Sequence, residues 1–256
     1  MILNEVESYL LGFAQTDGTL IGNTVHFELS IKDIDILEKI QEITENSKLK
    51  TRIRNTNFAE NYESCILQLS DCDILNKLKL FLPKGKKSEI ISIPNFEFSE
   101  RDYWRGIIDG DGSLGIKKNG IPFLSLNTSS EGLFESFKDL VMRKTELNIK
   151  AKRNERDNTY NIVLTMLNCY AITKYLYENS ILHIDRKKKK AEAIINYPYR
   201  EYNSVSNKRP FSIEDDLIIN SYSSKEASQI LNRKLVSVNN RKRFLVNLER
   251  FGLMIN

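Results

Sequence analysis

The sequence predicts an α+β protein in which two similar halves, each with the order αββαββα, are followed by a small all-α domain. Three observations support this. The order of helix-like and strand-like segments recurs, two Asp-Gly segments lie 94 residues apart in matching places, and a basic tail carries helix-capping residues. The expected boundaries are 1–82 for the first half, 83–99 for a linker, 100–197 for the second half, 198–210 for another linker and 211–256 for a helical module.

The first half begins with an apolar, helix-like stretch over Val6–Thr16 that ends at Asp17-Gly18. Thr19–Ser30 then alternates apolar and polar residues like a hairpin, with Gly22-Asn23 as its turn. The remaining elements expected in this half are a helix over Asp33–Thr44, strands over Leu49–Asn57 and Tyr62–Ser70, and a short helix over Asp71–Phe81.

The second half repeats this order after Pro83–Ser99, a segment with two of the five prolines that is typical of a linker. A helix over Asp102–Asp109 leads into Gly110-Asp111-Gly112, as the first helix leads into Asp17-Gly18. The elements expected next are strands over Ser113–Lys117 and Pro122–Thr128, a helix over Glu131–Lys144, strands over Ile149–Glu155 and Tyr160–Leu167, and helices over Tyr170–Glu178 and Asp185–Tyr197.

The C-terminal tail is basic and predicted to be helical. Nine Lys/Arg and five Asp/Glu lie between Asn207 and Asn256, so this tail carries the whole net charge of +4. Ser212, Ser223 and Ser237 are expected to cap three short helices, an arrangement that resembles a helix-turn-helix or Myb-like DNA reader. The alternative is a helical appendage packed on the core. The residues expected to contact DNA are Asn239, Asn240, Arg241 and Arg243 on the third helix.

The bulk composition excludes several classes of protein. No apolar run approaches the length of a membrane span and the N-terminal residues carry acids, so we expect an intracellular protein with neither a signal peptide nor a membrane partner. The three cysteines are mostly far apart and the chain has only two histidines, which argues against a zinc site or a disulfide framework. We expect Cys65, Cys72 and Cys169 to be reduced and mostly buried.

Two helix ends are the strongest candidates for chemistry. Small residues four apart, Gly12 and Thr16 in one stretch and Gly106 and Gly110 in the other, lie on one helix face and allow two helices to pack closely. If these stretches pack on each other, their C-terminal ends bring Asp17 next to Asp111. A helix C-terminus carries partial negative charge and two carboxylates repel, so a cation is required there.

A hard divalent ion satisfies that requirement. Mg²⁺ binds one or two carboxylates together with waters and substrate phosphate, and backbone carbonyls at Thr16 and Gly110 are candidate additional ligands. Mn²⁺ is an alternative, and Ca²⁺ is a candidate for a non-catalytic substitute.

Both stretches, Leu10–Gly18 and Trp104–Gly112, resemble the LAGLIDADG motif of homing endonucleases, and residues from about Glu5 to Tyr197 match the single-chain, two-repeat layout of that family. The resemblance implies a monomer that makes a metal-dependent, staggered double-strand break at a long, asymmetric DNA target. It assigns metal binding to Asp17 and Asp111, and packing and turns to Gly12, Gly18, Gly106 and Gly112. The first motif departs at Gln15, where the second has Asp109.

The family also implies one basic residue per half, after the last helix of each repeat. Lys84 and Lys187 are in equivalent places, and which lysine of each cluster points inward stays open. DNA contacts are expected from polar residues that alternate along the strands, where a plain solvent-facing sheet is the alternative. These residues are Lys50, Arg52 and Arg54 in the first half and Lys150, Lys152 and Asn154 in the second.

Two other functions compete with DNA cleavage. An intron RNA maturase would keep the fold and use it to clamp RNA, and the intact Asp17 and Asp111 do not exclude a dual role. A non-catalytic DNA-binding regulator built around the C-terminal helices would leave both acids without a purpose. Double-stranded DNA is therefore the expected partner, and no protein partner is required.

Overall fold

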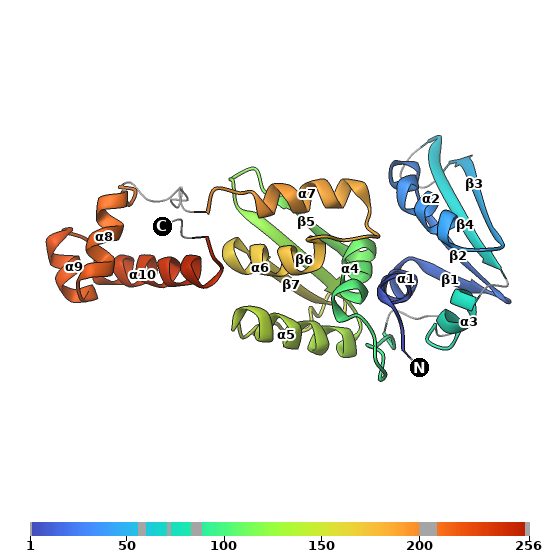
Figure 1. Ribbon diagram of the computed structural model, residues 1–256, viewed down its shortest axis with the longest axis horizontal. Coiled ribbons are helices and arrows are strands. Elements are labelled where there is room, and N and C mark those ends of the chain that lie inside the picture. Colours follow the sequence, from blue (N-terminus) through green and yellow to red (C-terminus); the bar gives the residue numbers. More distant parts are fainter. Residues whose placement is uncertain (1, 56–59, 71–72, 83–88, 200–208, 254–256) are drawn as a thin grey trace. The chain divides into compact units, whose positions relative to one another are not determined.

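The computed structural model describes residues 2–55, 60–70, 73–82, 89–199 and 209–253. The chain forms two compact units: one holds residues 1–117 and 121–195, and the other holds 118–120 and 196–256. Helices combine with two antiparallel sheets, which confirms the predicted α+β class (Figure 1). None of the described helices is both long and apolar enough to cross a lipid bilayer.

Two helices lie side by side at the centre of the first unit (Figure 1). They are α1 (Glu5–Thr16) and α4 (Glu100–Asp111). Helix α1 begins with a capping box, in which Asn4 accepts from the backbone N–H of Glu7 and the Glu7 carboxylate accepts from that of Asn4. Both helices are buried along almost their whole length, because each packs against the other and against its own sheet.

The first sheet has the strand order β1-β2-β4-β3 and is antiparallel throughout. A two-residue turn with Gly22 in the left-handed region, at φ 56°, joins β1 to β2, as predicted. Alternate side chains of β2 and β4 are buried against the helices, so the other face of the sheet is left for solvent or a ligand. The elements are β1 (Gly18–Ile21), β2 (Thr24–Ser30), η1 (Ile31–Asp33), α2 (Ile34–Ile43), β3 (Ser47–Arg54), β4 (Tyr62–Ser70) and α3 (Asp73–Lys79).

The second sheet has three strands in the order β5-β6-β7 and packs against α5, α6 and α7. The strand predicted over Ile149–Glu155 does not form, and only a single bridge joins Asn154 to Thr159. Helix α6 also begins at Met166, four residues before the predicted start. The elements are β5 (Gly112–Ile116), β6 (Pro122–Thr128), α5 (Glu131–Thr145), β7 (Tyr160–Thr165), α6 (Met166–Tyr177) and α7 (Asp185–Ile195).

Side chains explain why the predicted fourth strand is an irregular extended segment. Ile149 and Ala151 pack against the core, so the alternation that predicted a strand is real. Arg153 instead ties the segment down, since its guanidinium donates to the carbonyls of Asn158 and Ser129 and lies over the Tyr160 ring. Side-chain hydrogen bonds therefore anchor the segment where a β-ladder was expected.

The second unit contains three helices: α8 (Ile213–Ser221), α9 (Ser224–Ile230) and α10 (Leu235–Arg250). The predicted caps of the first two form as capping boxes, Ser212 with Asp215 and Ser223 with Glu226. The predicted cap at Ser237 is wrong, because α10 begins two residues earlier, with Lys234 at the N-cap. A small apolar core joins the helices and consists of Ile219, Ala227, Leu231, Val238, Leu245 and Leu248.

Candidate active site at the paired helix ends

Two glycines let α1 and α4 touch through their backbones. A methyl group added at Gly12 would lie 2.2 Å from the Tyr103 carbonyl oxygen, and one added at Gly106 would lie 2.2 Å from that of Tyr9. No side chain fits in either place, since a carbon normally stays about 3.3 Å or more from such an oxygen. Gly18 and Gly112 instead pack closely on the ends of their own helices, against Ala14 and Ile108.

A reciprocal pair of hydrogen bonds ties the two helices at matching positions. The hydroxyl of Tyr9 on α1 donates to the Asp109 carboxylate at 2.8 Å, and that of Tyr103 on α4 donates to the Gln15 amide oxygen at 2.6 Å. Tyr9 and Tyr103, like Gln15 and Asp109, lie 94 residues apart in the sequence. The departure of the first motif at Gln15 therefore keeps the bond and changes its acceptor from a carboxylate to a neutral amide.

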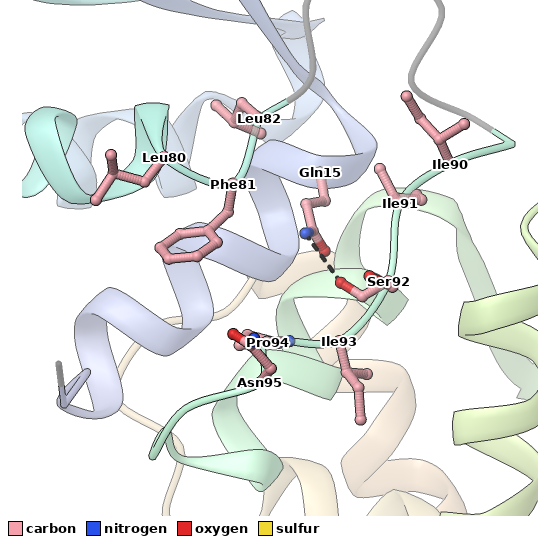
Figure 2. A pocket seen from close by; sticks show the side chains of 10 residues that line it. All are labelled: Gln15, Leu80, Phe81, Leu82, Ile90, Ile91, Ser92, Ile93, Pro94 and Asn95. Atoms are coloured by element: carbon pink, nitrogen blue, oxygen red, sulfur yellow. Dashed lines mark hydrogen bonds between the residues drawn. The ribbon is translucent and has the colours of Figure 1, made fainter.

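Gln15 also anchors the segment between α3 and α4. Its amide nitrogen donates to the Ser92 carbonyl at 3.2 Å (Figure 2). Part of the predicted linker is thus packed, with Ile91 buried and its carbonyl accepting from Ser130. A pocket of about 420 Å³ opens beside Gln15 and is lined by Leu80, Phe81, Leu82, Ile90, Ile91, Ser92, Ile93, Pro94 and Asn95.

The two motif acids lie at the C-terminal ends of the paired helices. Asp17 is the C-cap of α1 and Asp111 is the last residue of α4. The carboxylate of Asp17 lies against the residue before Asp111, since a methyl group at Gly110 would be 3.1 Å from Asp17 Oδ2 and 1.9 Å from Thr16 Oγ1. Asp111 is exposed and lines a cleft of about 360 Å³ together with Gln15, Thr16, Ile91, Asn127, Thr128, Ser129 and Thr159.

Lys187 on α7 supplies a positive charge at the end of α4. Its ammonium donates to the carbonyls of Ile108 at 2.8 Å, Asp109 at 2.5 Å and Gly112 at 2.8 Å, with Gly110 farther away at 3.4 Å. Burial lowers the pKa of Lys187, while the negative charges of Asp109, Asp17 and Asp33 act to raise it. Lys187 therefore offsets part of the negative charge at this helix end, where a metal ion was expected to do so.

The other basic residues around Lys187 are engaged elsewhere or exposed. Arg186 pairs with Asp33 at 2.8 Å, and Lys188 donates to the Tyr177 carbonyl at 2.5 Å. Lys189 and Lys190 are exposed. Among this cluster, Lys187 is the member that points into the site. The equivalent residue of the first half, Lys84, lies outside the described residues.

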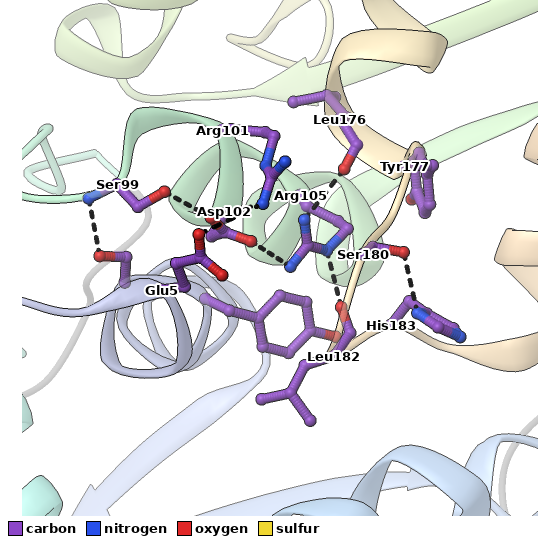
Figure 3. A network of polar contacts seen from close by, with 12 residues as sticks. Glu5, Ser99, Arg101, Asp102, Arg105, Leu176, Tyr177, Ser180, Leu182 and His183 are labelled. Carbon is purple, nitrogen blue, oxygen red and sulfur yellow. Dashed lines mark hydrogen bonds and ion pairs between the residues drawn. The ribbon is translucent and has the colours of Figure 1, made fainter.

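A buried polar network, which the sequence did not indicate, fixes α4 and the chain that leads into α7. The Asp109 carboxylate accepts from the Tyr177 hydroxyl at 2.6 Å and from the Ile184 N–H at 3.0 Å. Arg105, fully buried, pairs with Asp102 and donates to the carbonyls of Leu182 and Leu176 (Figure 3). The one hint in the sequence was Arg105, which lies among apolar residues of a predicted buried helix, because a buried charge requires partners.

Burial is the largest influence on the acid at the centre of this network. It raises the pKa of Asp109, against the charge of Lys187 and the hydrogen bonds from Tyr177, Ile184 and Tyr9, which lower it. The network connects α1, α4, α6 and the start of α7, so the position of Lys187 depends on the same contacts that hold the paired helices together.

Residues 99–249 match the LAGLIDADG-like domain family. The chain belongs to this family. The matched region includes α4, Asp111, Lys187, α8, α9 and all of α10 except its last residue, whereas α1 and its LAGLIDADG-like motif lie before it. A comparison with curated proteins finds no match.

Solved structures with a similar fold include LAGLIDADG proteins. The homing endonuclease I-WcaI, bound to its DNA recognition sequence, has a TM-score of 0.54 at 19% identity, over 75% of this chain and 88% of that one. Full-length DUF199/WhiA from Thermatoga maritima has a TM-score of 0.46 at 15% identity, over 96% and 92%. The LAGLIDADG homing endonuclease I-GzeII, in complex with its DNA target, has 0.45 at 12% identity, over 78% and 99%.

The LAGLIDADG chain has a basic, open face on its first sheet. Lys50, Arg52 and Arg54 alternate along β3 and are exposed, as predicted from the sequence. Arg52 and Arg54 reach across the sheet to Glu28, at 2.7 and 3.0 Å. Although burial acts to raise the pKa of Glu28, its hydrogen bond with Arg52 and the charges of both arginines hold that pKa below its usual value.

The corresponding basic residues of the second half lie on the irregular segment. Lys150 and Lys152 are exposed. Asn154 is exposed too, but its side-chain oxygen accepts from the Arg156 N–H at 3.0 Å and so helps to form a turn. The open face of the neighbouring sheet is mostly polar and uncharged, with Ser113, Ser125, Asn127, Asn161, Val163 and Thr165 alternating along β5, β6 and β7.

One of the four residues predicted to contact DNA from α10 has a structural role. Arg241 is buried and forms a double hydrogen bond with Asp216 at 2.7 Å, and it lies near the rings of Phe211 and Phe244. It joins α10 to α8, so its assignment to DNA is wrong. The other three, Asn239, Asn240 and Arg243, are exposed.

Proposed function

We propose that this chain is a site-specific DNA endonuclease that cuts both strands of a long, asymmetric target as a monomer. The observation that carries the proposal is that Asp17 and Asp111 end two helices packed through glycine, with the Asp17 carboxylate against Gly110, the residue before Asp111. Carboxylates at a helix C-terminus are electrostatically unfavourable, and such an arrangement is typical of a functional site. The I-WcaI homing endonuclease, which has this fold, is solved bound to its DNA recognition sequence.

The donor atoms fit a hard divalent cation. Asp17 and Asp111 supply carboxylate oxygens at the helix ends, where Gly110 packs closely on Thr16 and Asp17, and Mg²⁺ binds through one or two carboxylates with waters and phosphate. In the described part of the chain, no group of three or more His, Cys, Asp or Glu could hold a metal ion, so waters and substrate phosphate would have to complete the ligand set around the two carboxylates. Bound Mg²⁺ or Mn²⁺ would supply Lewis acidity and an activated water for phosphodiester hydrolysis.

The chain's own residues would bind and orient the substrate. Lys50, Arg52 and Arg54 offer cations to the phosphate backbone, and the amides and hydroxyls of the second sheet offer hydrogen bonds to base edges. Lys187 lies among the carbonyls of α4 and would stabilise negative charge that develops at the scissile phosphate. We assign Lys84 the same role in the first half, by its equivalent place in the sequence.

Cleavage of the uninterrupted version of the gene's own locus tests the proposal. The protein is incubated with that DNA in Mg²⁺ or in EDTA, beside the variants Asp17→Asn and Asp111→Asn. Asp139→Asn, which changes an exposed acid on α5, is the matched control. We expect a staggered double-strand break in Mg²⁺ from the parent and the control, and none in EDTA or from the two site variants.

Each other outcome identifies a different function. Binding of the duplex without cleavage under any divalent ion would favour a DNA-binding regulator. Preferential binding of the intron RNA would favour a maturase on the same fold. Cleavage that survives both site substitutions would contradict the assignment of Asp17 and Asp111.

A further inference from the structure

The outward face of α10 has an unusual composition. Seven residues share it at helical spacing, and all are exposed: Val236, Asn239, Asn240, Arg243, Val246, Asn247 and Arg250. Within Leu235–Arg250, the only acid is Glu249, which lies toward the flank of the helix. We call these seven residues the outer stripe. Its polar members are amides and guanidiniums only, and the two valines are 68% and 57% exposed.

The opposite face of α10 is fixed in place. Val238, Leu245 and Leu248 enter the small core, and Arg241 pairs with Asp216 on α8. A second pair, Arg233 with Asp215 at 2.7 Å, holds the turn between α9 and α10. Arg233 and Arg241 therefore pair with carboxylates of the same unit, and the outer stripe lies on the face of α10 opposite its core.

We propose that the outer stripe binds in the major groove of duplex DNA and reads bases there. The groove is about 12 Å wide and accepts one α-helix, in which Asn pairs with adenine and Arg with guanine. Positive charge without any acid on the stripe complements the phosphates beside the groove. Exposed valines can contact thymine methyl groups. A-form RNA has a major groove too narrow for side chains to read, so the stripe fits DNA and not duplex RNA.

A DNA-reading α10 would give the proposed endonuclease a second recognition element, in addition to its sheets. Residues 196–212 join α7 to α8, and a chain of that length spans at most roughly 60 Å. Two tethered elements bind one duplex with an effective concentration set by their linker. The chain carries one such tail, so the second block of contacted bases lies on one side of the cleavage position.

Selection of bound sequences from a randomised duplex pool tests the proposal. The full-length chain carries Asp111→Asn, so that bound DNA stays intact. We expect two separated blocks of preferred bases, with adenine and guanine in the shorter block. Adding Asn240→Ala or Arg243→Ala is expected to erase the shorter block only and to weaken binding of the selected duplex roughly tenfold each.

Lys225→Ala, which removes an exposed cation of α9 off the outer stripe, is the matched control, and Tm is measured for every variant. An unchanged Tm together with a retained shorter block in the control supports base reading by α10. The proposal is overturned if a single block is selected and neither stripe variant alters it, or if Arg243→Ala and Lys225→Ala weaken DNA binding equally. Either result leaves the endonuclease assignment standing. Failure to select any duplex sequence refutes both, and equal competition by the same sequence as duplex RNA refutes major-groove reading.

Discussion

Replacing Gly106 by alanine tests the backbone contact on which the site depends. The added methyl would lie 2.2 Å from the Tyr9 carbonyl oxygen and 2.7 Å from the Phe13 nitrogen. A normal carbon–oxygen contact is about 3.3 Å, so α1 and α4 must separate by about 1 Å. Such overpacking costs roughly 3 kcal/mol. The higher helix propensity of alanine returns about 1 kcal/mol.

The net loss of roughly 2 kcal/mol corresponds to a Tm lower by roughly 4–8 °C for a unit of this size. Calorimetry measures it, and DNA cleavage is measured on the same samples because separation of the helices also moves Asp17 from Asp111. The control is Gly132→Ala on α5, where the nearest atom to the new methyl is 3.3 Å away. A Gly106→Ala variant as stable as the parent, or more stable, would refute the close approach of the two helices.

Three further predictions follow from single contacts. Tyr9→Phe should lower the free energy of unfolding by roughly 1.5–3 kcal/mol, because its hydroxyl donates to the Asp109 carboxylate. Tyr103→Phe, whose hydroxyl donates to the neutral Gln15 amide, should lower it by roughly 0.5–1.5 kcal/mol. Urea denaturation of both variants measures the two losses, and equal losses would contradict the prediction. Burial, with the charges of Lys39 and Lys188, lowers the pKa of His183 from 6.5 to about 4. The unfolded chain therefore binds this proton first, so stability falls as the pH drops from about 6.5 toward 4, and His183→Gln should flatten that part of a Tm-against-pH curve. Arg241→Ala should destabilise the C-terminal unit by roughly 3 kcal/mol or more by leaving Asp216 unpaired, while Arg243→Ala leaves Tm unchanged; hydrogen exchange of α8 and α10 distinguishes them.

Local patterns in the sequence predicted most helices and strands to within a few residues. Apolar periodicity defined α1, α2 and α5, and the Gly22-Asn23 turn defined the first hairpin. Alternation of apolar and polar residues wrongly predicted a strand over Ile149–Glu155. Alternation shows which side chains face the core, but it does not show whether the backbone hydrogen-bonds to a neighbouring strand. Cap chemistry failed once, at Ser237, where helix formation begins earlier than the serine.

The candidate site was predicted in part. The two glycine-spaced motifs predicted that α1 and α4 would pack closely, and they do; the Asp17 carboxylate lies against Gly110, the residue before Asp111. Arg241 was wrongly assigned to DNA contact, because its position in the sequence does not show that it pairs with Asp216 on α8. The Tyr9–Asp109 bond and the anchoring of Arg105 were not foreseen, since their partners come from segments 70 to 100 residues away.

The sequence by itself determined the chemistry that this protein can offer: two acids after glycine-spaced helices, lysine clusters and a basic tail. These are properties of short segments, where spacing alone decides which side chains share a face. Only the tertiary structure decided which charges reach one another. It put Lys187, among five consecutive basic residues, on the carbonyls of α4, and it used Arg241 to hold two helices together. Electrostatic partnership depends on distance in space, which local sequence does not encode.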